Sequence, residues 1–266
     1  MTMAKVNDIN MYYEIHGEGE PLILISGNGA ESSQWKGMIP TFSKNYKVIP
    51  FDNRGAGRTD CPDIEYSMDM MAADVIGLMD VLGIEKAHIL GASMGGMIAQ
   101  NIAYLYPDRV KSLILVVTTM KDSRRNNYAC NQAIKQVQDG SDPEALAKYS
   151  VIWSFPEEVF ENPEAVERIK NVMLPVLNPQ TVDAFKRQNE ALVEFDSSKW
   201  INEITVPTLV MAGEGDIIWP QKYSGQELAK AISGSKFVSL PGAHMAYILS
   251  AEAFQEHVME FLGSFK

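Results

Sequence analysis

Residues 88–100 read HILGASMGGMIAQ, a strand-like run that stops at a single serine among glycines. The letters GASMG match the pattern G-x-S-x-G, which arises by chance in on the order of one chain in ten of this length. The context is more specific, because residues 86–92 predict a strand and residues 94–107 predict a helix. A serine in such a strand–turn–helix corner is typical of a nucleophile elbow, whose tight backbone requires small neighbours. The alternative is a glycine-rich turn with an idle serine.

Outward from this corner the chain alternates between strand and helix patterns. The predicted strands are residues 46–52, 86–92, 110–118, 206–213 and 236–240, and the predicted helices are residues 67–82, 94–107, 224–232 and 250–262. Near-continuous apolar strands that alternate with helices favour a mainly parallel sheet covered on both faces. Near the N-terminus, residues 11–15 and 21–27 flank a glycine-containing turn and predict an antiparallel hairpin.

Residues 121–200 interrupt this alternation and contain no convincing strand pattern. They predict short helices at residues 123–139, 143–153, 163–173 and 179–193, separated by prolines. We therefore divide the chain into an α/β core of residues 1–120 and 201–266 and a helical cap of residues 121–200. Such an insertion is expected to cover the carboxyl ends of the strands, where α/β folds bind their ligands.

Composition limits the partners and the location that we expect. The 266 residues are 46% hydrophobic, and the net charge of −11 disfavours nucleic acid as a partner. The apolar runs are far shorter than the roughly 18 residues of a membrane helix, and the N-terminus shows no apolar signal segment. Cys61 and Cys130 lack the spacing of metal ligands or of a disulfide framework. We expect a cytoplasmic monomer or homodimer that binds neither membrane nor nucleic acid.

A serine hydroxyl is a weak nucleophile unless a base takes its proton. His16 ends the first predicted strand, His88 lies within a strand, and His257 lies within the last helix. Elimination leaves His244, in the loop PGAHM, as the base. The base in turn needs a carboxylate that orients it. Asp216 follows a predicted strand and gives the order serine, acid, histidine along the chain.

Two other acids compete with Asp216 for this role. Glu214 lies two residues earlier in the same loop, and Asp122 follows the strand that precedes the insertion. Either position is also typical of a solvated surface acid, and Asp122 is a candidate cap for the next helix. We predict Asp216 as the orienting acid.

Five stretches of the core carry a resemblance to a known family: LILISGNG, FDNRGAGRTD, HILGASMGGMIAQ, VPTLVMAGEGD and PGAHM. With them the chain resembles the α/β-hydrolase superfamily, within its lidded group without cofactors. The branch that it resembles holds carboxylesterases, enol-lactonases and similar small hydrolases. The resemblance implies an α/β fold with a mostly parallel eight-stranded sheet flanked by helices, and a helical cap inserted between strands six and seven. It also implies that no metal or organic cofactor is needed. The resemblance is only a weak guide to the substrate, because proteins with this fold catalyse many different reactions.

The resemblance further implies an oxyanion hole made of two backbone N–H groups. One belongs to Met94, directly after the nucleophile, and the other to Asn28 in the loop SGNGA. Many members of the family have His-Gly where this chain has Ser26-Gly27. This departure puts the usual support of the loop in doubt and makes Ser26 a candidate for replacing the hydrogen bonds of the histidine.

These residues predict hydrolysis of carboxylic esters of small, mostly apolar substrates. We expect Ser93 to attack the carbonyl carbon while His244 takes the proton and Asp216 stabilises the imidazolium. The predicted pocket residues are Trp153, Ile218, Trp219 and Met245. The same triad suits hydrolysis of lactones or enol-lactones, or cleavage of a carbon–carbon bond next to a carbonyl. A small-molecule sensor with a slow hydrolase site is an alternative from another class.

Overall fold

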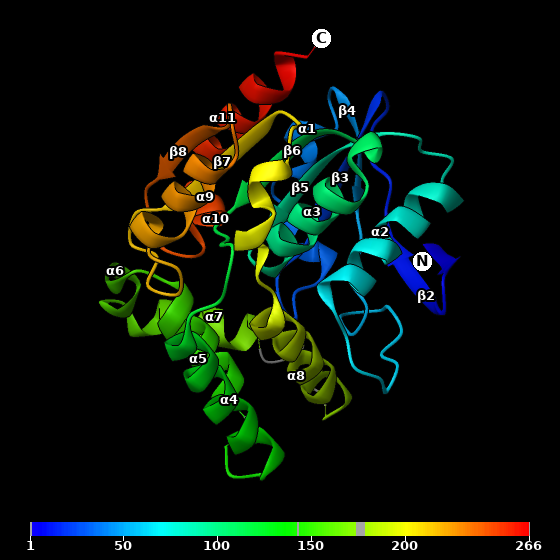
Figure 1. Cartoon of the computed structure of the whole chain (residues 1–266). Coiled ribbons are helices and arrows are strands. Elements are labelled where there is room, and N and C mark those ends of the chain that lie inside the picture. Colours follow the sequence, from blue (N-terminus) through cyan, green and yellow to red (C-terminus); the bar gives the residue numbers. More distant parts are fainter. Residues whose placement is uncertain (1, 143, 174–178, 266) are drawn as a thin grey trace.

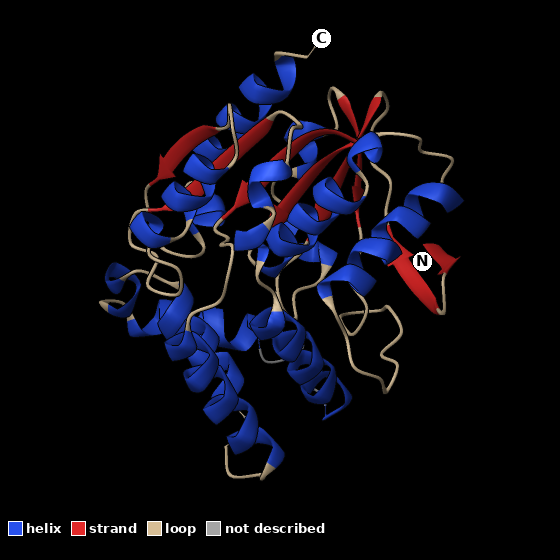
Figure 2. Cartoon of the chain, viewed as in Figure 1, coloured by secondary structure: helices blue, strands red, loops and turns tan. Residues whose placement is uncertain are grey.

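The computed structural model describes residues 2–142, 144–173 and 179–265. Its centre is a parallel sheet of six strands in the order β4-β3-β5-β6-β7-β8 (Figures 1 and 2). The strands are β3 (Glu20–Ile25), β4 (Tyr46–Pro50), β5 (Ala87–Ala92), β6 (Val110–Val116), β7 (Thr208–Gly213) and β8 (Lys236–Leu240). The two central strands β5 and β6 pair in parallel, from Ala87 beside Val110 to Ala92 beside Val116, so their carboxyl ends lie at the same edge of the sheet.

Successive side chains of the central strands enter two separate apolar cores, one on each face of the sheet. Ile23 and Ile25 of β3 belong to one core, and Leu22 and Leu24 belong to the other. Helices α2 (Met68–Val81), α3 (Met94–Leu105) and α9 (Gly225–Ala231) complete the first core. Helices α1 (Ile39–Phe42), α10 (Ala246–Leu249) and α11 (Ala251–Gly263) complete the second. Burial on both faces is why these strands appear as unbroken apolar runs.

The core elements predicted from the sequence match the observed ones to within two residues at either end. Helix α2 shows why its boundaries were predictable. The hydroxyl of Ser67 accepts a hydrogen bond from the N–H of Met70 at 3.1 Å, and Gly83, with φ of +65°, ends the helix.

The predicted hairpin between residues 11–15 and 21–27 is wrong. Strand β2 (Ile9–Tyr13) instead pairs antiparallel with β1 (Thr2–Val6), through a turn in which Asn7 has φ of 50°. Strand β3 pairs in parallel with β4 and β5, because its two apolar faces belong in the centre of the sheet. The eight strands of the described residues therefore form a six-stranded sheet and a separate two-stranded hairpin. A bridge between Tyr13 and Phe51 joins the hairpin to the end of β4.

In the described part of the chain, five α-helices lie between β6 and β7. They are α4 (Arg124–Gln138), α5 (Ala145–Ser154), α6 (Glu157–Phe160), α7 (Pro163–Met173) and α8 (Pro179–Glu194). In Figure 1 they form a layer below the sheet. The predicted helices appear as α4, α5, α7 and α8, and α6 is an additional single turn. Pro143, the predicted start of the second helix, lies outside the described residues.

The chain segments that enter and leave this helical layer are tied together. Lys121 and Asp196 form an isolated antiparallel bridge, and the Lys121 ammonium lies 2.5 Å from the Asp196 carboxylate. This ion pair lowers the pKa of Asp196 to about 2. The pairing supports our proposed division into a cap of residues 121–200 and a core of residues 1–120 and 201–266.

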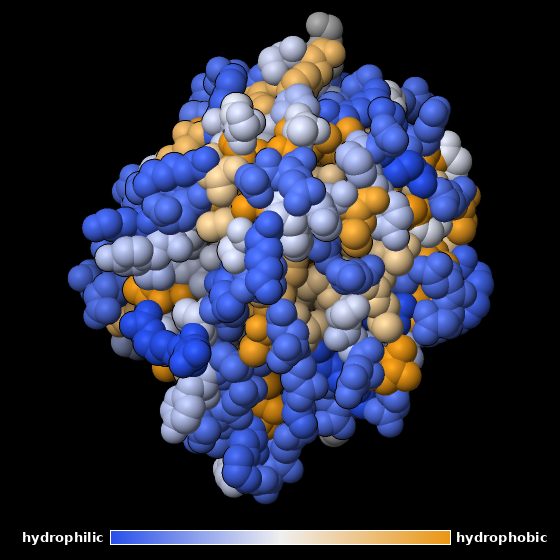
Figure 3. All heavy atoms as spheres, in the orientation of Figure 1, coloured by the Kyte–Doolittle hydropathy of each residue, from blue (hydrophilic) through white to orange (hydrophobic). Residues whose placement is uncertain are grey.

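The face seen in Figure 3 is mostly hydrophilic, with small apolar patches. Within the described part of the chain, every helix is too short or too polar to cross a membrane.

Candidate active site

Ser93 occupies the sharp turn between β5 and α3. Its φ of 57° and ψ of −122° lie in a region that residues other than glycine rarely adopt. The neighbouring backbone leaves no room for larger residues. A Cβ on Gly91 would lie 2.1 Å from the carbonyl oxygen of Gly95, and a Cβ on Gly95 would lie 2.2 Å from that of Ile25. These contacts explain the small residues of the motif.

The strained turn is held by hydrogen bonds to the neighbouring strand. The Ser93 N–H donates to the Val116 carbonyl at 2.9 Å, and the Thr118 hydroxyl donates to the Ser93 carbonyl at 2.8 Å. Thr118 also fills the space beside Gly96, where a Cβ would lie 2.6 Å from its side chain. The end of β6 therefore fixes both the backbone of Ser93 and the start of α3.

The three residues predicted as nucleophile, base and acid form one hydrogen-bonded relay. His244 Nε2 lies 2.9 Å from Ser93 Oγ, and His244 Nδ1 lies 2.8 Å from Asp216 Oδ2. The other oxygen of Asp216 accepts the N–H groups of Ile218 at 2.9 Å and of Trp219 at 3.0 Å. Asp216 is 4% exposed and His244 is 6% exposed. The acid and the base are therefore fixed in orientation and shielded from water.

The competing acids do not contact His244. Glu214 is exposed, and its carboxylate accepts a hydrogen bond from Ser239. Asp122 Oδ1 accepts the indole N–H of Trp219 at 2.8 Å and the side-chain amide of Asn126 at 3.0 Å. Burial raises the pKa of Asp122. Asp122 therefore positions Trp219 and does not orient the histidine directly. The ring of Trp219 packs against His244.

Two backbone N–H groups beside Ser93, those predicted as oxyanion donors, have no hydrogen-bond acceptor among the described residues. The loop after β3 lies against the nucleophile, because a Cβ on Gly27 would be 3.2 Å from Ser93 Cβ. In the described ranges, neither the N–H of Asn28 nor that of Met94 donates to another residue. The structure thus leaves available both donors that the family pattern implied.

Ser26 supplies hydrogen bonds to the loop that lacks the usual histidine. Its hydroxyl accepts the indole N–H of Trp35 at 3.1 Å and donates to the carbonyl of Glu31 at 3.2 Å. Its carbonyl accepts the side-chain amide of Asn53 at 3.0 Å. Ser26 is fully buried, so these bonds fix the base of the loop.

A second support of this loop comes from the cap, and the sequence analysis missed it. The fully buried Gln188 of α8 accepts the Gly29 N–H at 2.7 Å and donates to the Arg54 carbonyl at 2.7 Å. Phe185, one turn earlier, packs on Gly29, where a Cβ would lie 2.5 Å from the ring. A sequence signal existed, because Gln188 shares a helix face with Phe185 and Leu192 at spacings of three and four residues. A polar residue on the apolar face of a helix indicates that its side chain is hydrogen-bonded to a buried group elsewhere in the protein.

We expect Gln188→Ala to lower kcat for the reaction at Ser93 by about 10-fold or more, with a smaller change in KM. Loss of the clamp releases the loop that carries the Asn28 N–H, and an oxyanion donor acts mainly in the transition state. Gln188→Glu retains the acceptor for Gly29 and should lose less activity. Gln138→Ala on the exposed face of α4 is the matched control. Unchanged kcat in folded Gln188→Ala would contradict this role.

A cavity of about 170 Å³ opens at Ser93, between the core and the cap. Ile218, Trp219 and Met245 line it, as the sequence predicted. Trp153 does not belong to the wall that the described residues form, so that prediction is corrected. On α5 the residues that face the cavity are Tyr149, Ser150 and Ser154. Trp153 points elsewhere and packs beneath the guanidinium of Arg125, 5.2 Å from the ring centre.

Cys130 also lines the cavity, and its thiol is a second candidate nucleophile. Burial raises the pKa of its thiol to about 12, so the thiol is protonated near neutral pH. Since the thiolate is the reactive form, Cys130 is inert beside the activated Ser93.

The cap also contacts the loops that carry the acid and the base. The Arg125 guanidinium donates to the carbonyl of Ile217 at 2.7 Å, in the loop after Asp216. The N–H of Met245 donates to the carbonyl of Ser154 at 3.1 Å, beside the histidine. Cap and catalytic loops therefore form one packed unit.

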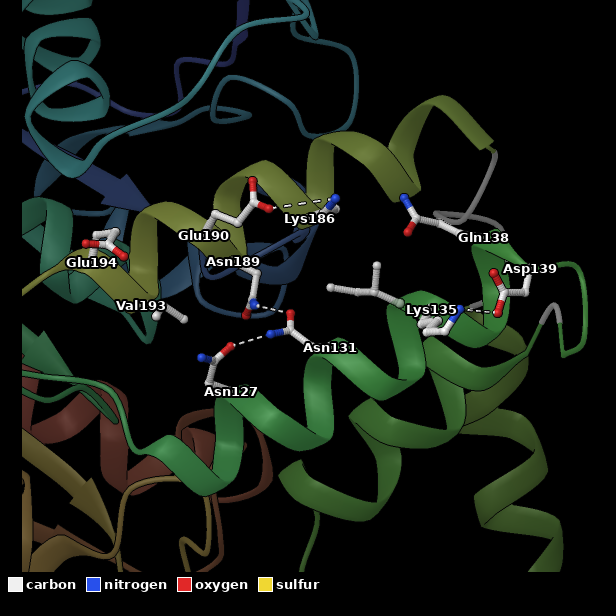
Figure 4. Close-up of a pocket in the computed structure, with 11 residues that line it drawn as sticks. Asn127, Asn131, Lys135, Gln138, Asp139, Lys186, Asn189, Glu190, Val193 and Glu194 are labelled. Carbon is white, nitrogen blue, oxygen red and sulfur yellow. Dashed lines mark hydrogen bonds and ion pairs between the residues drawn. The ribbon is translucent and has the colours of Figure 1, made fainter.

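A second and larger hollow, of about 400 Å³, lies between α4 and α8 (Figure 4). Asn189 donates to Asn131 at 3.3 Å, and Asn131 donates to Asn127 at 2.8 Å. Neither Ser93 nor His244 lines this hollow, whereas Asn189 lines both cavities. Asn189 therefore lies in the wall between them, and we place the chemistry in the smaller cavity.

A strained serine on a strand–helix corner, hydrogen-bonded to a buried histidine–aspartate pair under a helical cap, defines a hydrolase of the α/β type. Residues 20–251 match the family described as alpha/beta hydrolase fold, and the chain belongs to this family. The predicted α/β-hydrolase fold class is confirmed, but within the described residues the main sheet has six strands where the resemblance implied eight.

Known proteins similar to the chain carry several hydrolase names. It is 29% identical to the putative carbamate hydrolase RutD of Azorhizobium caulinodans, over 99% of this chain and 98% of that protein. The solved enol-lactonase from Burkholderia xenovorans LB400 superposes with a TM-score of 0.89 at 27% identity, over 98% and 100% of the two chains. The solved structure of a thermophilic esterase from Thermogutta terrifontis superposes with a TM-score of 0.88 at 26% identity, over 99% of both chains.

Proposed function

We propose that the protein hydrolyses carboxylic esters of small, mostly apolar substrates through an acyl intermediate on Ser93. The observation that carries this proposal is the continuous relay from Ser93 through His244 to Asp216, beside a cavity between the core and the cap. The same relay operates on any substrate with a reactive acyl carbon.

In the first step Ser93 Oγ attacks the carbonyl carbon while His244 Nε2 takes its proton. The carboxylate of Asp216 stabilises the imidazolium through Nδ1–H. The N–H groups of Asn28 and Met94 stabilise the charge that develops on the carbonyl oxygen. His244 then gives its proton to the leaving alcohol, and in the second half it activates a water molecule against the acyl-serine.

The cavity supports a small, neutral substrate. Its volume of about 170 Å³ is below the roughly 300–1,000 Å³ of common ligand pockets. Phe185, Leu192 and Ile218 contribute apolar surface, and no lysine or arginine belongs to the described lining. A substrate with a negative charge would therefore have no cationic partner in this wall.

Lactone or enol-lactone hydrolysis is the second candidate, because the chain is similar over nearly its whole length to an enol-lactonase. The carbamate hydrolase name of another relative suggests the same attack on an acyl carbon. We also propose a cytoplasmic monomer or homodimer that needs no cofactor, and the free thiols of Cys61 and Cys130 support a reducing location.

A panel of p-nitrophenyl esters tests the esterase proposal. We expect kcat/KM to be high for the acetate and the butyrate and to fall steeply for the octanoate, because a cavity of about 170 Å³ leaves little room for an eight-carbon chain beside the leaving group. Turnover of simple lactones without turnover of any ester would instead favour the lactonase. A folded protein that hydrolyses neither class would contradict both.

A further inference from the structure

Two carboxamide side chains in the catalytic cavity each leave one buried polar atom without a partner. Asn28 Oδ1 and Gln34 Nε2 are inaccessible to solvent and make no hydrogen bond to any described residue. Both residues line the cavity together with Ser93 and His244. Buried polar atoms in native proteins are nearly always paired, so an orphan donor and an orphan acceptor in one cavity point to a ligand group that pairs with them.

Their positions place this group beside the reacting carbonyl. Asn28 follows Gly27, which lies against Ser93, and the Asn28 backbone N–H is one of the proposed oxyanion donors. Gln34 lies on the 3-10 helix Ser32–Trp35. The indole of Trp35, the next residue, donates a hydrogen bond to Ser26, at the base of the loop that carries Asn28. The Gln34 Oε1 accepts the Tyr247 hydroxyl at 3.5 Å, which leaves the amide nitrogen as its free end.

The other amides of the cavity wall already have partners. Asn126 bonds to Asp122 and Tyr149, and Asn189 bonds to Asn131. Asn28 and Gln34 differ from them, because each has a buried polar atom that bonds to no described residue. The wall offers no cation among the described residues, so the matching ligand group is neutral.

We propose that Asn28 and Gln34 determine specificity by binding a neutral hydroxyl or amide group next to the scissile carbonyl of the substrate. Such a group donates to one carboxamide and accepts from the other, which a hydrocarbon of the same size cannot do. This inference rests on the proposed hydrolase function and narrows its substrate class to acyl groups with one polar substituent in an otherwise apolar pocket. A site built to bond a hydroxyl discriminates strongly against the analogue that lacks it.

Ethyl glycolate and ethyl propionate form a matched pair for the test, because they differ by a hydroxyl in place of a methyl group. The hydroxyl also makes the glycolate carbonyl more reactive, so the kcat/KM ratio is compared with the ratio of the two alkaline hydrolysis rates. We expect the wild-type preference for the glycolate to exceed that ratio by about 10-fold or more. Gln34→Met and Asn28→Leu should each reduce this ratio toward that of alkaline hydrolysis, whereas Gln138→Met on the cap surface should preserve it. The ratio cancels any general loss from the oxyanion loop, because both esters share that step.

The outcomes separate this inference from the proposed function. A wild-type preference for the glycolate no larger than that of alkaline hydrolysis overturns the inference and leaves the esterase intact. A preference for the glycolate above that of alkaline hydrolysis that persists in both Gln34→Met and Asn28→Leu overturns the assignment to these residues. If the folded wild type hydrolyses neither ester and no p-nitrophenyl ester, the proposed function fails and the inference fails with it.

Discussion

Replacing Ser93 with alanine is expected to lower kcat/KM for p-nitrophenyl acetate by about 10⁴-fold or more. The loss is this large because Ser93 Oγ is the atom that attacks and the only described hydroxyl within hydrogen-bond distance of His244. The turn itself should survive, because alanine meets the same backbone strain as serine and fits the same space. Residual hydrolysis above the uncatalysed rate would come from the oxyanion N–H groups.

The exposed Ser264→Ala provides the control for Ser93→Ala, with circular dichroism and thermal unfolding to confirm that both variants fold. A folded Ser93→Ala variant that keeps a tenth or more of the wild-type kcat/KM would show that another group performs the attack.

The second large effect is expected from Asp216→Asn, which should lower kcat by about 10⁴-fold. The asparagine keeps an oxygen for the N–H groups of Ile218 and Trp219, so the loop should retain its shape. It no longer provides a charge to stabilise the imidazolium, and its amide favours the wrong tautomer of His244. The measurement is kcat for p-nitrophenyl acetate across a pH series.

Two carboxylates near the site serve as matched controls for Asp216→Asn. Glu214→Gln should remain close to wild type, because Glu214 is exposed and bonds to Ser239. Asp122→Asn should show an intermediate loss, because Asp122 reaches the histidine only through Trp219. A deeper defect in either control than in Asp216→Asn would move the role of the orienting acid to that residue.

Local patterns were sufficient to predict the centre of the fold and the three residues of the relay. The elbow is a local structure, because Ser93 requires small neighbours within a few residues and the flanking strand and helix have distinct periodicities. His244 and Asp216 were recognisable because each follows a core strand and few alternatives exist. Such residues are identified by their place in the chain order, without knowledge of distant contacts.

The missed features depend on contacts between segments that are far apart in sequence. The pairing of Gln188 with Gly29 joins positions 159 residues apart, which no local pattern reveals. The hairpin prediction failed because a glycine turn shows that the chain reverses but not which strand becomes the partner. Trp153 was misplaced because the direction of a side chain on a cap helix depends on how that helix packs on the core.

The polar character of the pocket was also beyond the sequence analysis. Apolar and aromatic residues near the site predicted a mostly apolar wall, and several of them do line it. The buried carboxamides of Asn28 and Gln34 add two unpaired polar atoms to that wall. The loop letters SGNGA and SSQW are equally typical of ordinary turns, so only the cavity itself distinguishes a ligand contact from a surface residue.

The central claim is that Ser93 is a nucleophile activated by His244. Diethyl p-nitrophenyl phosphate tests it directly, because it phosphorylates an activated serine and releases p-nitrophenolate. Peptide mass spectrometry of the treated protein should find the diethylphosphoryl group on Ser93, with no label in Ser93→Ala and very slow labelling in His244→Ala. Labelling of Cys130 or any residue other than Ser93, or equal labelling of Ser93→Ala, would contradict the account.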